Sequence, residues 1–144
     1  MVISKFKHIV PLYDFGKPSL TIIVCDREAY EKEIKVIDKN NENKEDRPNY
    51  NQFSGYTFCK TVKGIDTYYS MYAIDTLIDK QGDIDMNTIG HEATHIKNHI
   101  YYSLGIEPDT DKDEPEAYFM GWIVEMLCKD IKKYLKKNNN EKPN

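Results

Sequence analysis

The residues of this chain best placed to do chemistry are two histidines four positions apart, with a glutamate directly after the first. They are His91, Glu92 and His95. On an α-helix, residues i and i+4 lie on one face about 6 Å apart along the axis, so both imidazoles can reach one metal ion. Zinc takes nitrogen donors at about 2.0–2.1 Å, and a catalytic zinc site keeps one position for water. Glu92 stands at the edge of this face, where it could accept a proton from that water.

The residues around the motif predict the helix that it needs. Candidate N-cap residues precede it, and an apolar run continues to Leu104 before Gly105 supplies a stop. The N-cap candidates are Asp83, Asp85, Asn87 and Thr88. A short motif of this kind also arises by chance, so the alternative is a solvent-facing helix that merely carries two histidines.

A third metal ligand is expected from a second helix, which begins around residues 111–118 and runs to about Lys133. Pro115 and the acidic residues beside it are typical of a helix start. Glu114 and Glu116 are the candidate ligands. Asp113 and Glu116 have the spacing of a capping box, which would give Glu116 a structural role. We favour Glu114, which shares a helix face with Tyr118, Gly121 and Glu125.

The other two histidines do not complete this set. A straight helix places His99 about 12 Å from His91, too far for both to hold one ion, so His99 is expected on the helix surface or behind the ligands. His8 belongs to no motif.

The stretch from Met86 to Cys128 resembles the gluzincin metallopeptidases, the thermolysin-like group. In these proteins a His-Glu-x-x-His helix is completed by a glutamate about twenty residues later, at the start of the next helix. The stretch is most similar to small peptidase-like proteins of tailed phages and prophages, whose second helix reads Glu-Pro-x-Ala-Tyr followed by a Gly-Trp or Gly-Tyr pair. This chain has that pattern at residues 114–118 and 121–122. The resemblance covers under a third of the chain.

The resemblance implies a zinc ion held by His91, His95 and Glu114, with Glu92 as the general base. In the larger gluzincins an aspartate four residues after the third ligand supports the first histidine, whereas this chain has Tyr118 there, which carries no charge. The larger relatives also take a transition-state-stabilising His or Tyr from a further C-terminal domain. Candidates for that role here are Tyr118, Tyr101 and Tyr102, although packing is the better explanation for each of them.

The expected activity is zinc-dependent hydrolysis of peptide bonds in a peptide or protein substrate, in which Glu92 accepts a proton from water and passes it to the leaving amine. One alternative is a deformylase-like zinc hydrolase, whose third ligand is an upstream cysteine in a Glu-Gly-Cys-Leu sequence. Cys59 instead follows Thr57 and Phe58. Another alternative is a non-catalytic phage structural or accessory protein, in which the metal joins two helices and its fourth position is closed.

Length and charge predict one domain over residues 1–137. A net charge of −4 and a pI near 5.6 argue against nucleic-acid binding and against binding to anionic membranes. Lysines 132, 133, 136 and 137 form a local basic end, which we interpret as a solvated helix terminus. Nothing in the sequence indicates the oligomeric state.

Cysteine usage predicts a reducing compartment. Cys25, Cys59 and Cys128 are far apart, odd in number and in no Cys-x-x-Cys pattern. We read no signal peptide or membrane span in the first ten residues, which carry Lys5 and Lys7. We therefore expect a cytoplasmic location, which for a phage-encoded protein means the bacterial host cytoplasm or the virion.

The predicted fold is α+β, a minimal zincin-like domain with a small mixed sheet packed on the active-site helix and a C-terminal helix. We expect a strand over 20–25, a helix over 27–37, and a hairpin of strands 56–62 and 66–74. Residues 38–52 are polar and should form an exposed loop, and residues 138–144 should be a disordered tail. The 66–74 strand is the candidate edge strand beside the metal helix, where a peptide could bind by strand addition, although an ordinary half-buried strand is the alternative.

Overall fold

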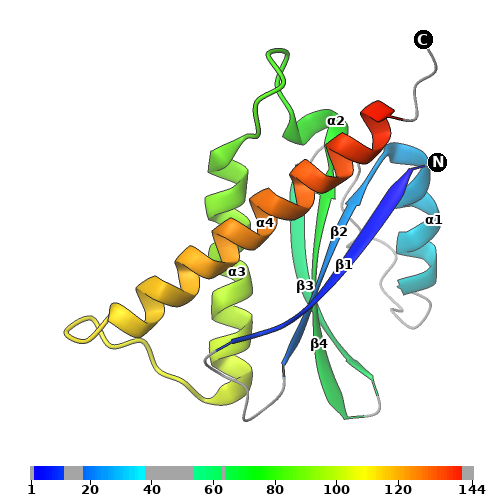
Figure 1. Cartoon of the computed structure of the whole chain (residues 1–144). Helices are drawn as coiled ribbons and strands as arrows, with labels where there is room; N and C mark the ends of the chain where they lie inside the picture. The colour runs from blue at the N-terminus through cyan, green and yellow to red at the C-terminus, as the bar shows by residue number, and fades with distance from the viewer. Residues whose placement is uncertain (1, 12–17, 38–53, 63, 141–144) are drawn as a thin grey trace.

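The structure is a computed structural model that describes residues 2–11, 18–37, 54–62 and 64–140 (Figure 1). Its elements are, in chain order, β1 (Ile3–Ile9), β2 (Ser19–Cys25), α1 (Arg27–Ile37), β3 (Gly55–Val62), β4 (Ile65–Ala73), α2 (Ile74–Leu77), α3 (Met86–Leu104) and α4 (Glu114–Asn140). A mixed sheet and packed helices make up the fold, so the predicted α+β class is confirmed. The strand over 20–25, the helix over 27–37 and the hairpin are also confirmed.

The four strands are ordered β1-β2-β4-β3. β2 and β4 run parallel at the centre, and each outer strand is antiparallel to its neighbour. Because both faces of β2 are covered, its side chains from Leu20 to Cys25 form a nearly continuous apolar run. The parallel central pair forces the chain to cross over, and α1 and β3 lie in that connection.

Helices cover both faces of the sheet. On one face, α3 and α4 pack against Leu20, Ile22, Val24, Tyr68 and Tyr72 in the main core. On the other face, Ala29 and Tyr30 of α1 pack against Ile23, Met71 and Ala73. Figure 1 shows α4 crossing in front of α3 on the first of these faces. Because side chains alternate between the two faces of each strand, only those on the face covered by α3 can contact the metal motif.

The prediction that the 66–74 strand, now β4, is an edge strand is wrong. β4 lies between β2 and β3, so both of its edges are paired, and in the described part of the sheet β3 is the edge strand on the side of α3. The prediction failed because the order of two hairpin strands in a sheet depends on where the third strand inserts. Here β2 pairs with β4 through parallel contacts from Ser19↔Thr67 to Cys25↔Ala73.

The other edge of the sheet is β1, which the sequence analysis did not predict. Along β1, exposed Lys5 and Lys7 alternate with half-buried Phe6 and His8. Alternation of lysines with inward residues is typical of an edge strand, where charge discourages further pairing. This alternation was present in the sequence, but β1 has too few apolar residues to resemble a buried strand.

α4 extends beyond its predicted end. It continues past Lys133 to Asn140, so the first three residues of the segment predicted to be disordered are helical. The reason is that the apolar spacing continues through Leu127, Ile131 and Tyr134, all of them buried. Residues 141–144 and the predicted loop over 38–52 lie outside the described residues.

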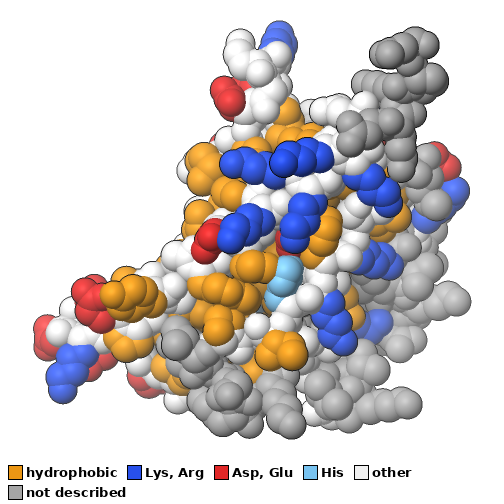
Figure 2. Space-filling model, viewed as in Figure 1, with side chains coloured by type: hydrophobic (Ala, Val, Ile, Leu, Met, Phe, Trp, Pro, Cys, Tyr) orange, Lys and Arg blue, Asp and Glu red, His pale blue; other side chains and the backbone are white. Residues whose placement is uncertain are grey.

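The far half of α4 carries the predicted basic end. Exposed lysines are found there at positions 129, 132, 133, 136 and 137. Figure 2 shows lysine side chains gathered over this part of the molecule, whereas hydrophobic side chains gather along the first half of α4. Over the described ranges, none of the helices has the length and apolar character needed to cross a membrane.

Candidate active site

The helix predicted to carry the histidine motif is confirmed as α3. Asp85 is its N-cap, with its side chain accepting hydrogen bonds from the Asn87 backbone N–H at 3.0 Å and from the Thr88 hydroxyl at 2.6 Å. The Thr88 hydroxyl lowers the pKa of Asp85 because it stabilises the charged carboxylate. At the other end, Gly105 has φ 65°, the left-handed cap that glycine adopts without strain. Both ends of the helix that carries the motif are therefore set by local cap preferences.

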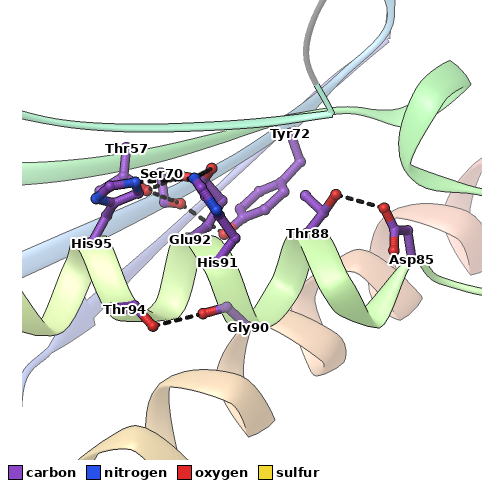
Figure 3. Close-up of polar contacts among 10 residues, drawn as sticks. All are labelled: Thr57, Ser70, Tyr72, Asp85, Thr88, Gly90, His91, Glu92, Thr94 and His95. Carbon is purple, nitrogen blue, oxygen red and sulfur yellow. Dashed lines mark hydrogen bonds and ion pairs between the residues drawn. The ribbon is translucent and has the colours of Figure 1, made fainter.

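One face of α3 is buried, and this determines which of its side chains point toward solvent. Ile89, Ala93, Ile96 and Ile100 recur at spacings of three and four residues, and all four are fully buried. His91 and His95 lie off this stripe and are exposed, with 68% of the His91 side chain accessible. The two rings stand on the side of α3 that faces β3 (Figure 3).

The histidine pair converges. Nε2 of His91 lies 3.0 Å from Nε2 of His95, and the ring centroids are 4.7 Å apart at an interplanar angle of 73°. Two nitrogens bound to one tetrahedral zinc ion at about 2.0–2.1 Å would be about 3.4 Å apart. The spacing in the structure is close to that value, so the pair fits joint ligation of one ion.

Glu92 is buried beside the pair, with 4% of its surface accessible. Its Oε2 accepts a hydrogen bond of 2.7 Å from the Thr57 hydroxyl on β3, and its Oε1 lies 3.9 Å from Nε2 of His91. One carboxylate oxygen is thus anchored on the sheet, and the other is near the nitrogens that would hold a metal ion. This is the arrangement a general base needs.

Three hydroxyl groups continue inward from Glu92. Thr57 Oγ1 lies 2.9 Å from Ser70 Oγ, which lies 2.8 Å from the Tyr72 hydroxyl. Figure 3 shows these side chains between the sheet and α3. Thr57 and Ser70 are partners in the β3–β4 register, and Tyr72 lies two residues further along β4 on the same face.

Gly55 lets β3 approach α3 closely. A Cβ atom at this position would lie 2.6 Å from Cγ of Glu92 and 3.1 Å from both Cγ2 of Thr88 and Cε1 of Tyr72. Any side chain there would displace Glu92 or the strand, since real Cβ atoms do not come so near to neighbours. The absence of a side chain at Gly55 is thus part of the site.

The structure does not bring Glu114 to the histidine pair. Within the described ranges, no three His, Cys, Asp or Glu side chains form a group that could hold a metal ion. Glu116 explains the difference, because it pairs with Lys97 on α3. Helical residues two positions apart differ by a rotation of about 200° around the helix axis. On α3, Lys97 therefore faces away from His95. On α4, Glu116 faces α3, so Glu114 faces away from it.

Glu114 instead lines a cavity of about 510 Å³ on the outer side of α4, together with Ala117, Tyr118, Gly121, Trp122 and Glu125. Most of these are the residues predicted to share its helix face. Tyr118, the proposed transition-state stabiliser, is 71% exposed there. The helix face was therefore predicted correctly, but it does not point at the motif.

The remaining candidates have other surroundings. Cys59, the deformylase-like ligand, lies on β3 two residues beyond Thr57 and belongs to no three-residue metal group in the described structure. Burial and then the charge of Asp66 raise its pKa. His99, which was expected on the helix surface or behind the ligands, is half-buried. In the described structure, Cys25, Cys59 and Cys128 form no disulfide bond.

Sequence reasoning missed four site residues: Gly55, Thr57, Ser70 and Tyr72. None belongs to a motif, and each is typical of a strand or its start. The only sequence feature that could have found them is strand alternation, which puts Thr57 and Cys59 on one face of β3 and Ser70 and Tyr72 on one face of β4. The β3–β4 register was needed to bring the two sets together.

The donors present meet part of what zinc requires. His91 and His95 fit as nitrogen ligands, Glu92 fits as a base beside them, and the third protein donor is not in place. No family model, no curated protein and no solved structure matches this chain. The functional argument therefore depends on the chain's own geometry.

Proposed function

We propose that this chain is a zinc-dependent hydrolase of peptide bonds, with His91 and His95 as metal ligands and Glu92 as the general base. The observation that supports the proposal best is the position of Glu92. A solvent-facing helix that merely carries two histidines would leave the intervening glutamate exposed. Here it is 4% accessible, with one oxygen held by Thr57 and the other directed toward His91.

Burial of this carboxylate has a cost, which the hydrogen bond from Thr57 offsets in part. An ionised side chain removed from water is destabilising unless it is hydrogen-bonded or paired. A zinc ion bound by the histidines would lower the pKa of a water molecule and polarise a substrate carbonyl. Glu92 would then accept the proton of that water and return it to the leaving amine, and Thr57 would keep the carboxylate aimed at the same place.

β3 suggests why the substrate would be a peptide. It is an edge strand in the described sheet, it lies beside α3, and it carries Thr57, which contacts the base. An edge strand offers backbone N–H and C=O groups that can pair with an extended peptide. Strand addition to β3 would place a peptide backbone alongside the histidine pair.

Glu114 remains our proposed third ligand, by resemblance. Glu116 is engaged by Lys97, whereas Glu114 is exposed at the first residue of α4. For Glu114 to join the histidines, the first turn of α4 has to rotate away from the Lys97–Glu116 contact. Metal binding is therefore expected to compete with that ion pair.

A non-catalytic metal clamp between two helices is less well supported. α3 and α4 are already joined by the Lys97–Glu116 pair and by stacking of Tyr101 on Phe119, at a centroid distance of 6.0 Å. An ion is not needed to hold these helices together. The clamp also gives no reason for burying Glu92 beside the ligands.

The decisive experiment measures zinc content and peptide hydrolysis for the wild type and Glu92→Gln. We expect about one zinc per chain in both proteins, and a loss of hydrolysis of at least about 100-fold in the variant. Glu107→Gln is the matched control, because Glu107 is exposed in the α3–α4 connection and the charge change is the same. Full activity in Glu92→Gln, or a wild type that binds zinc without cleaving any peptide of a diverse library, would overturn the proposal.

A further inference from the structure

A row of three hydroxyl groups leads from the core to Glu92. Tyr72 and Ser70 are fully buried on β4, and Thr57 on β3 is half-buried. The successive oxygen distances are 2.8 Å from Tyr72 to Ser70, 2.9 Å from Ser70 to Thr57 and 2.7 Å from Thr57 to Glu92. All three are within the normal range for O–H···O hydrogen bonds.

The end of this row at Glu92 has a fixed direction. A hydroxyl has a single proton, and a carboxylate can only accept, so Thr57 gives its proton to Glu92. The Ser70 hydroxyl donates to the Tyr72 hydroxyl, and it also lies within hydrogen-bond distance of Thr57, where either oxygen can be the donor.

The inner end of the row is held in the core. Burial raises the pKa of Tyr72 well above its usual range, so its hydroxyl keeps the proton at any ordinary pH. Its ring is packed in the main core, where it has no freedom to move. A rigid hydroxyl at one end and a carboxylate at the other restrict the orientation of the two groups between them.

Packing alone does not explain these residue types. Valine at 57, alanine at 70 and phenylalanine at 72 would fill nearly the same volumes with no polar groups to satisfy. Placing three hydroxyls in line between a sheet and a helix is costly unless each one is hydrogen-bonded. The row ends on the one buried carboxylate of the motif.

We propose that Thr57, held in turn by Ser70 and Tyr72, is a positioning residue that fixes the carboxylate of Glu92 with Oε2 on the sheet and Oε1 toward the histidines. The inference rests on the proposed function, in which Glu92 is the base. Thr57 acts through Glu92 and needs no contact with substrate. A structural role alone would affect folding stability without affecting turnover per folded molecule.

The test compares Thr57→Val, which keeps the shape and removes the hydroxyl, with Thr57→Ser, which keeps the hydroxyl. With zinc-loaded protein and a cleaved peptide, we expect kcat to fall about 10- to 100-fold in Thr57→Val, with KM and zinc content nearly unchanged. Thr57→Ser should stay within about threefold of the wild type. Wild-type kcat in Thr57→Val, when Glu92→Gln is inactive, would overturn the inference while leaving the proposed function intact.

A second measurement does not depend on activity. NMR side-chain couplings of Glu92 in zinc-free protein should report one rotamer in the wild type and Thr57→Ser, and averaging in Thr57→Val. Averaging in the wild type, or a single rotamer in Thr57→Val, would overturn the positioning role. If no peptide is cleaved, the proposed function fails, and the couplings alone decide whether Thr57 positions Glu92.

Discussion

Lys97 on α3 and Glu116 on α4 form an ion pair with Nζ 2.5 Å from Oε1, and both side chains are largely buried. The pair fixes the rotation of the first turn of α4, because Glu116 must face α3. Glu114, two residues earlier, must then face the opposite way. A contact between two residues outside the metal motif thus keeps Glu114 away from it.

Zinc affinity should therefore respond in opposite directions to two similar substitutions. Glu116→Gln weakens the contact that opposes rotation of α4, so we expect about fivefold tighter zinc binding, the effect of about 1 kcal/mol. Glu114→Gln removes the proposed ligand and should weaken binding by at least tenfold. Competition with a chromophoric chelator measures both. Weaker binding in Glu116→Gln together with unchanged binding in Glu114→Gln would identify Glu116 as the ligand.

The cap at Asp85 predicts a pH dependence of stability. Its pKa is lowered in the folded protein, chiefly by the Thr88 hydroxyl, so folding favours the ionised form. Its contribution is fully present above the usual Asp value of about 3.9 and is lost as the pH falls through the lower folded pKa. Asp85→Ala should cost about 1 kcal/mol at neutral pH, measured by urea unfolding.

Asp85→Asn is the control for that experiment. Asparagine caps helices about as well as aspartate but does not titrate in this range. Asn at this position should keep most of the stability at pH 7 and lose less than the wild type on acidification. Identical acid profiles for the wild type and Asp85→Asn would contradict the charge-based account.

The sequence predicted what local patterns control. Spacing, turn residues and cap preferences predict helix α3 with its caps at Asp85 and Gly105. The same kinds of pattern predict helix α1 and the β3–β4 hairpin. The convergence of His91 and His95 also follows, because it depends only on helix periodicity. These features need no information about the rest of the chain.

Contacts between distant segments were not predictable in the same way. The insertion of β2 beside β4 made β3 the edge strand, and the Lys97–Glu116 pair turned Glu114 outward. The Thr57–Glu92 hydrogen bond joins residues 35 positions apart. Many residues could have been paired in each case, and no local pattern distinguishes the pairs that form.

A buried carboxylate far from the motif offers a stability test. Asp130 of α4 is fully buried, and its Oδ2 lies 2.6 Å from Nε2 of His8 on β1, while Lys133 approaches its Oδ1 at 3.3 Å. His8→Leu should destabilise the protein by about 3 kcal/mol or more, because the charge loses a partner. The double variant with Asp130→Leu should recover much of that loss in denaturant unfolding. A double variant that is less stable than His8→Leu would show that the pair itself is not the source of the effect.

Two glycines make a matched pair for testing the close approach of β3 to α3. Gly55→Ala puts a methyl group 2.6 Å from Cγ of Glu92, so we expect a loss of about 1–3 kcal/mol in stability and a displaced Glu92 side chain. Gly90→Ala adds the same methyl group to α3 one residue before His91, with open space around it. There the better helix propensity of alanine should stabilise the protein by up to about 1 kcal/mol. Unfolding curves give both energies, and peptide hydrolysis should fall only in Gly55→Ala. Equal stability changes, or hydrolysis lost equally in both variants, would mean that contact with Glu92 does not explain the glycine at 55.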